Sequence, residues 1–106
     1  MIKPLPVLTA ALSVLAMAAP AAADAIDGNW CAADGRSMSI SGPQIDTPGG
    51  TRMRGDYDRH GFRYIVPATE KPAGSKVDMS LVDDDTLHVK VGTGPTKTWR
   101  RCKPTS

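Results

Sequence analysis

The side chains with the clearest chemical potential are two histidines, two cysteines and a run of three aspartates. Nucleophilic hydrolysis would need a serine or cysteine beside a histidine and a carboxylate. His60 falls in a predicted hairpin turn, His88 falls on the outward side of a predicted strand, and no serine lies in a G-x-S-x-G elbow. We therefore expect a protein that is not an enzyme and that uses no cofactor.

Acidic residues offer two further possibilities for chemistry, a calcium site and a pair of catalytic carboxylates. Asp83-Asp84-Asp85 lacks the alternating ligands, glycine and distant glutamate of an EF-hand, and aspartate is favoured in tight turns. A turn is therefore expected, with a weak cation site as the alternative. Asp56 and Asp58 share a predicted strand with arginines, which favours cross-strand ion pairs over a carboxylate pair for glycoside hydrolysis. No metal site is expected.

One local basic cluster lies near the end of the chain, at Trp99, Arg100, Arg101 and Lys103. It is a candidate contact for an anionic partner, either a cell-envelope component or an acidic protein surface. The alternative is an inward tryptophan flanked by exposed charges on a closing strand. Basic and acidic residues otherwise alternate without a basic stripe, so nucleic-acid binding is not expected.

The N-terminal residues are typical of an export signal. Lys3 supplies a positive charge, residues 7–18 form an apolar run, and small residues come next. Cleavage after Ala23 is preferred, and cleavage after Ala25 is the alternative. The domains are then a signal peptide over 1–23 and a small domain over 24–106. Because the apolar run is short for a membrane span, an uncleaved anchor is disfavoured, and a periplasmic or secreted location is expected.

Two cysteines remain after signal cleavage, one near each end of the domain. Export implies an oxidising compartment, and Cys31–Cys102 is the one intramolecular pairing that two cysteines allow. Such a bond closes a loop of about 70 residues and contributes about 4 kcal/mol in the chain-entropy model. A redox pair is disfavoured because the C-x-x-C spacing is missing. The sequence therefore predicts a structural disulfide.

Apolar residues in the mature chain recur with a period of two, separated by turn residues, which is typical of half-buried strands. The pattern indicates roughly seven short strands at hairpin spacing, with residues 67–75 as the longest loop. The predicted inward set is Trp30, Met38, Ile40, Met53, Tyr57, Phe62, Tyr64, Val66, Val77, Met79, Leu81, Leu87, Val89, Val91 and Trp99.

These strands predict an all-β fold, an antiparallel meander that closes into a small barrel of about six to eight strands. Closure removes both exposed edges, and a Cys31–Cys102 bond would hold the first and last strands together. A small β-sandwich is the alternative. We expect a monomer whose interior is filled by side chains, so that a binding site lies on the loops or the outer face.

Gly28-Asn29-Trp30 resembles the G-x-W motif at the start of the first strand of lipocalin-like (calycin) barrels. The resemblance implies that an arginine near the end of the chain, Arg100 or Arg101, packs over Trp30. The mature chain is about half the usual length of that family, and the other lipocalin motifs are missing. The whole chain also resembles small exported proteins of Gram-negative bacteria, a resemblance that implies no activity.

Two functional hypotheses are consistent with these patterns. The first is an interaction module that binds a protein or envelope component through its loops, with residues 67–75 as the leading candidate; it predicts a filled core. The second is a reduced lipocalin-like carrier of a small molecule. It predicts an internal apolar cavity lined by Trp30, Tyr57, Phe62 and Trp99.

Overall fold

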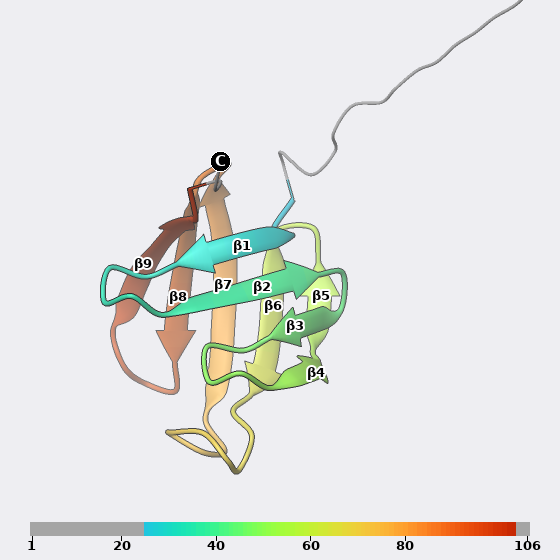
Figure 1. Cartoon of the computed structure of the whole chain (residues 1–106), viewed down its shortest axis with the longest axis vertical. Helices are drawn as coiled ribbons and strands as arrows, with labels where there is room; N and C mark the ends of the chain where they lie inside the picture. The colour runs from blue at the N-terminus through green and yellow to red at the C-terminus, as the bar shows by residue number, and fades with distance from the viewer. Residues whose placement is uncertain (1–24, 104–106) are drawn as a thin grey trace, which may run out of the picture.

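A computed structural model describes residues 25–103, so the predicted signal peptide over 1–23 lies outside the described residues. The described part of the chain contains no helix with the length and apolar character that a membrane span requires. It forms nine strands in one antiparallel sheet (Figure 1). They are β1 (Gly28–Cys31), β2 (Ser37–Ser41), β3 (Gln44–Asp46), β4 (Arg52–Arg54), β5 (Asp56–Asp58), β6 (Gly61–Ile65), β7 (Lys76–Asp83), β8 (Thr86–Val91) and β9 (Thr96–Arg101).

The sheet is a meander that curls back on itself. Every strand pairs with the next one in the chain except across the β4–β5 junction, and the first strand β1 also pairs with the last strand β9. The nearly closed barrel confirms the predicted all-β fold and the predicted contact between the first and last strands. The strand count is nine, slightly above the predicted six to eight.

Asp56 and Asp58 were predicted to share one strand with neighbouring arginines, and the higher count comes from a corner at Gly55 that divides this strand into β4 and β5. β4 pairs with β3 and β5 pairs with β6, so the chain changes neighbours at this residue. A Cβ at Gly55 would lie 2.5 Å from the Arg63 carbonyl oxygen and 2.5 Å from a Phe62 ring carbon. Glycine is therefore required at this corner between β4 and β5. Figure 1 shows β1–β3 crossing in front of β6–β9.

The interior is packed with large side chains. The largest fully buried residues are Trp30, Phe62, Ile26, Ile45, Met79 and Leu87. Ile26 and Ile45 were not predicted to be inside, because Ile26 precedes β1 and the three residues of β3 are too few to show alternation. Four residues of the predicted inward set are only partly buried against this core: Met53, Tyr57, Leu81 and Val91.

One end of the barrel is covered by residues 25–27. The Trp30 indole N–H donates to the Ile26 carbonyl oxygen at 2.8 Å, and the Ile26 N–H donates to the Arg59 carbonyl oxygen at 2.7 Å. The Asp27 carboxylate accepts hydrogen bonds from the Tyr57 hydroxyl and from a backbone N–H. The segment before β1 is thus bonded to the strands around it and closes this end.

Arg101 lies across the same end. Its guanidinium carbon is 4.3 Å from the centroid of the Trp30 ring, and its Nη1 and Nη2 donate to the carbonyl oxygens of Asp27 and Ala25 at 2.7 and 2.8 Å. Its Nε donates to the Asp84 carbonyl oxygen. The expected packing of a terminal arginine on Trp30 is confirmed, and Arg101 is the residue that makes it.

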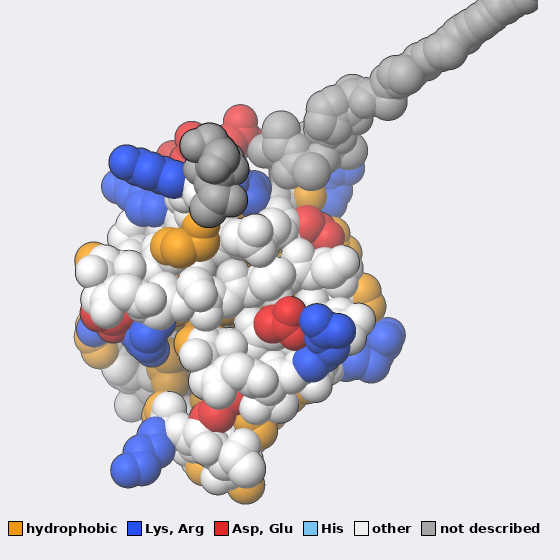
Figure 2. Space-filling view, viewed as in Figure 1, with side chains coloured by type: hydrophobic (Ala, Val, Ile, Leu, Met, Phe, Trp, Pro, Cys, Tyr) orange, Lys and Arg blue, Asp and Glu red, His pale blue; other side chains and the backbone are white. Residues whose placement is uncertain are grey.

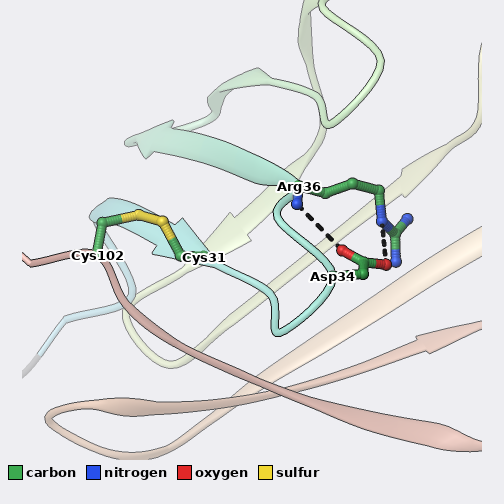
Figure 3. The surroundings of a disulfide bond; sticks show 4 residues. All are labelled: Cys31, Asp34, Arg36 and Cys102. Atoms are coloured by element: carbon green, nitrogen blue, oxygen red, sulfur yellow. Dashed lines mark hydrogen bonds and ion pairs between the residues drawn. A yellow bond between two sulfur atoms is a disulfide. The ribbon is translucent and has the colours of Figure 1, made fainter.

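The disulfide joins the same two strands. Cys31 and Cys102 are bonded with their Cα atoms 5.0 Å apart, as predicted (Figure 3). The Cys102 N–H also donates to the Asn29 carbonyl oxygen at 3.0 Å. The β1–β9 register contains only two residue pairs, so the bond and the Arg101 contacts reinforce a short ladder.

We expect Arg101→Gln to lower the free energy of unfolding by about 2–3 kcal/mol, since it removes charge-assisted hydrogen bonds and the contact with Trp30. Urea denaturation of the oxidised protein measures the change. Arg54→Gln, on an exposed position of β4, is the matched control and should stay within about 0.5 kcal/mol of the wild type. Equal losses in the two variants would contradict the role given to Arg101.

Candidate binding site at the barrel mouth

The predicted basic cluster does not form one surface. Trp99 is buried, and Arg101 is bonded at the covered end of the barrel. Arg100 and Lys103 are exposed, and the Arg100 guanidinium donates to the Thr86 hydroxyl oxygen at 2.8 Å. The four residues therefore divide between the interior, the covered end and the outer surface, and their role as a partner contact stays a prediction.

The other residues considered for chemistry lie on the surface. His60 and His88 are exposed, in the β5–β6 turn and on β8. The Asp83 carboxylate accepts a hydrogen bond from the Asp85 N–H at 3.0 Å, which confirms the expected turn. Asp58 pairs with Arg63 across the β5–β6 hairpin, at 3.4 Å. Among residues 25–103, no three His, Cys, Asp or Glu side chains gather closely enough to hold a metal ion.

The outer face of β1, β2 and β3 carries a wide, shallow depression of about 1250 Å³ that is open to solvent. Its floor includes small uncharged side chains such as Ser37 and Ser39, together with the disulfide. Figure 2 shows that this face has few charged side chains. Its lining also includes charged residues such as Asp27, Asp46 and Lys103, but it is so open to solvent that a ligand would bury little of its surface there.

A more enclosed pocket of about 310 Å³ lies at the mouth of the barrel, opposite the end that residues 25–27 cover. Its wall combines apolar side chains of the barrel interior with polar and charged residues on the rim. The apolar lining includes Met38, Tyr64, Val66, Val77, Val89, Val91 and Trp99, and the rim includes Arg36, Glu70, Lys71 and Lys97. Its volume is at the lower limit of small-molecule sites, which span about 300–1000 Å³.

Two loops build one side of this mouth. The loop over 67–75, which lies away from the C-terminal end of the chain in Figure 1, is held by its own backbone hydrogen bonds, including Val66 N–H to Ser75 O at 2.9 Å. The Thr47 hydroxyl donates to a Glu70 carboxylate oxygen at 2.5 Å and so ties this loop to the one over 47–51. Burial raises the pKa of Glu70, but hydrogen bonds from Thr47, Thr51 and backbone N–H groups outweigh it and hold the pKa below its usual value.

Strand alternation places two cationic side chains, Lys97 and Arg36, at the rim of the pocket. Lys97 is two residues before the inward Trp99, and Arg36 is two residues before the inward Met38, so both have inward parity. The Arg36 guanidinium carbon lies 5.3 Å from the centroid of the Trp99 ring. Its Nε also forms an exposed ion pair with Asp34 at 2.9 Å (Figure 3). The mouth therefore carries positive charge directly above an aromatic wall.

Tyr64 is the buried polar residue of the pocket. Its side chain is 6% exposed, and its hydroxyl makes no hydrogen bond to another residue in the described part of the chain. Burial and, to a smaller extent, the charge of Glu70 raise the pKa of Tyr64 to about 12, against the opposing charge of Arg36. Tyr64 lines the pocket together with both charged residues, and its high pKa keeps the hydroxyl neutral and able to donate a hydrogen bond.

The sequence did not single out these residues as a site. Tyr64 was predicted only as a core residue, whereas Trp99 was also predicted in the basic cluster and in the lining of an internal cavity. For Lys97 and Arg36, the available signal was the parity that places them inward. Of the four residues expected to line an internal cavity, Trp99 borders the pocket. Trp30 and Phe62 are fully buried in the core, and the Tyr57 hydroxyl is bonded to Asp27.

We expect the stability of the protein to fall as the pH rises from about 10 towards about 12. The tyrosine of the unfolded chain loses its proton near its ordinary pKa of 10.0, whereas Tyr64 in the folded protein keeps its proton to about 12. Phenolate absorbance of a Tyr57→Phe variant reports Tyr64 alone, since the hydrogen bond to Asp27 also raises the pKa of Tyr57. Titration of Tyr64 near 10 in the folded variant would contradict its burial.

Comparison of the chain with family models, with curated proteins and with solved structures finds no match.

Proposed function

We propose that this chain is an exported, non-enzymatic interaction module that binds a protein or an envelope component at the mouth of its barrel. The observation that carries the proposal is the contrast between the two ends. One end is covered by residues 25–27 and Arg101, whereas the other holds a pocket with an aromatic wall and a charged rim. A rigid barrel that exposes such a pocket at one end can position it for a partner.

The packed interior supports an interaction module over the small-molecule carrier. A carrier of the lipocalin type would keep an apolar cavity between the aromatic residues, but Trp30 and Phe62 are fully buried. The rings of Phe62 and Tyr64 also contact edge to face, with centroids 6.4 Å apart. The space at the mouth holds only part of a larger ligand, which favours recognition of one group on a partner.

The loop over 67–75 supports the mouth as the contact surface. Thr69, Glu70, Lys71 and Pro72 belong to this loop and line the pocket. Thr69 and Lys71 are exposed, so a partner that enters the pocket would also touch the loop. Its internal hydrogen bonds and the Thr47–Glu70 contact hold it in place before a partner arrives, which reduces the entropy lost on binding.

Export is part of the proposal, and the disulfide is compatible with it because such bonds persist in oxidising compartments. We expect the native product to begin at Asp24, or at Ile26 if the alternative site is cleaved. Intact mass before and after reduction and alkylation measures this. Two alkyl groups should be added only after reduction, whereas a full-length chain with two free thiols would contradict export.

Photo-crosslinking in cells that produce the protein tests the contact surface. A benzoylphenylalanine at Thr69 should give a discrete covalent adduct, because this exposed position borders the pocket. The same group at Thr98, exposed on β9, is the matched control and should give none. Lys97→Glu should reduce the yield of the Thr69 adduct roughly tenfold or more by reversing a charge at the rim.

Two outcomes of this crosslinking would overturn the proposal. An adduct at Thr98 without one at Thr69 would move the contact to the outer face of the barrel. Equal yields from the wild type and from Lys97→Glu would show that the rim does not take part.

A further inference from the structure

We propose that the barrel mouth binds an apolar carboxylate, with its apolar body against Trp99 and its carboxylate at Tyr64, Lys97 and Arg36. The inference deepens the proposed function and rests on it, because it names the group that a partner would place in the mouth. Three features of the pocket lead to it: its size and apolar wall, the buried hydroxyl without a partner, and the sign of the charge on the rim.

The pocket accepts a small apolar body. At about 30 Å³ for each water-sized group, a volume of about 310 Å³ holds about ten non-hydrogen atoms. Trp99 and the valines of β7 and β8 provide the apolar wall, and Met38 lies across from them on β2. A flat ring or a short branched chain would bury its surface here, whereas a long acyl chain would exceed the space above the packed core.

The Tyr64 hydroxyl favours a ligand that carries a hydrogen-bond acceptor. A hydroxyl that no residue of the protein bonds can donate its hydrogen to an acceptor on a ligand, and such a hydrogen bond is stronger where water is excluded. The hydroxyl of Tyr64 is in this position among the described residues, and it lines a pocket large enough for a ligand. A carboxylate oxygen placed beside the hydroxyl would accept a charge-assisted hydrogen bond, which is stronger than one between neutral groups.

The charges on the rim favour an anion. Lys71 and Lys97 form no ion pair within the described part of the chain, and Arg36, which lies over Trp99, has the exposed Asp34 as its one ion-pair partner there. Such pairs contribute little, so a bound carboxylate can replace Asp34 as the partner of Arg36. Glu70 is the acidic residue of the lining, and its carboxylate already accepts the Thr47 hydroxyl. A cationic ligand would meet three like charges.

Two sources present this chemistry, namely a free small acid and the C-terminal residue of a partner chain. Both carry an apolar body next to a carboxylate. They differ at the carbon next to the carboxylate: in a free acid this carbon carries no further chain, whereas in a peptide it carries the amide nitrogen of a chain that must leave the pocket. A free acid and a short peptide are therefore tested side by side.

The test uses the mature, oxidised protein labelled with ¹⁵N. 3-Phenylpropionate and its neutral amide, 3-phenylpropionamide, have the same shape and differ in charge. We expect the acid to shift the Trp99 indole N–H signal and to leave Trp30 unchanged, since the Trp30 indole is bonded to Ile26 in the core. The dissociation constant of the amide should be roughly tenfold higher, as expected when a charge-assisted contact is lost.

Variants distinguish a loss of binding to the acid from a loss of folding stability. Tyr64→Phe should weaken binding of the acid roughly tenfold and leave the protein at least as stable as the wild type, because the lost hydroxyl has no partner within residues 25–103. Lys97→Met should weaken binding of the acid and leave binding of the amide unchanged. Lys90→Met, on the exposed side of β8, is the matched control and should affect neither ligand.

The inference is overturned if acid and amide bind equally, or if Tyr64→Phe binds the acid as tightly as the wild type. A hexapeptide ending in phenylalanine, as the free acid and as the amide, identifies the source. Tighter binding of the peptide acid than of 3-phenylpropionate indicates a partner chain, and exclusion of the peptide indicates a free acid. If neither acid binds while Lys97→Glu still abolishes the Thr69 adduct, this inference fails and the proposed function stands.

Discussion

The short seam between β1 and β9 is the constraint on which the rest of the structure depends. Only two residue pairs join the first and last strands, yet without this seam β1 and β9 would become exposed edges in addition to β4 and β5. Arg101 strengthens the seam by stacking on Trp30 and donating to carbonyl oxygens on both sides of it. The Cys31–Cys102 bond adds a covalent link beside the paired residues Trp30 and Arg101. A domain of this size has a small core, so such local reinforcement decides whether the barrel stays closed.

An arginine packs over a tryptophan at each end of the barrel, but the two arginines are held differently. Arg101 donates to three backbone carbonyl oxygens and is part of the covered end. Arg36 lies over Trp99 with a single exposed ion-pair partner, Asp34. Backbone carbonyls cannot move without disturbing strands, whereas a surface ion pair exchanges readily. The same pair of residue types therefore stabilises the fold at one end and leaves the other end available for a ligand.

Because the interior is filled, the more enclosed pocket of the described structure lies at the mouth. Large side chains such as Trp30 and Phe62 occupy the space that a wider barrel would leave for a ligand. The remaining space is a pocket at the rim, where alternation places Lys97 and Arg36 above an apolar wall. A pocket of this kind suits recognition of one charged, apolar group on a partner. Tyr64 lines this pocket, and its hydroxyl has no hydrogen-bond partner among residues 25–103.

Alternation of apolar and polar residues by itself determined the all-β fold, most of the core and the antiparallel order, because strand periodicity is a local property. Two cysteines left one intramolecular pairing, so the Cys31–Cys102 bond was also determined. The corner at Gly55, the burial of Ile45 and the choice of Arg101 over Arg100 were decided only by tertiary structure. Each depends on contact with a part of the backbone that is distant in sequence. Gly55 lies against the Arg63 carbonyl, and Arg101 donates to the segment over 25–27. The mouth pocket likewise combines residues from separate strands and loops, and no local pattern shows that the Tyr64 hydroxyl lacks a partner there.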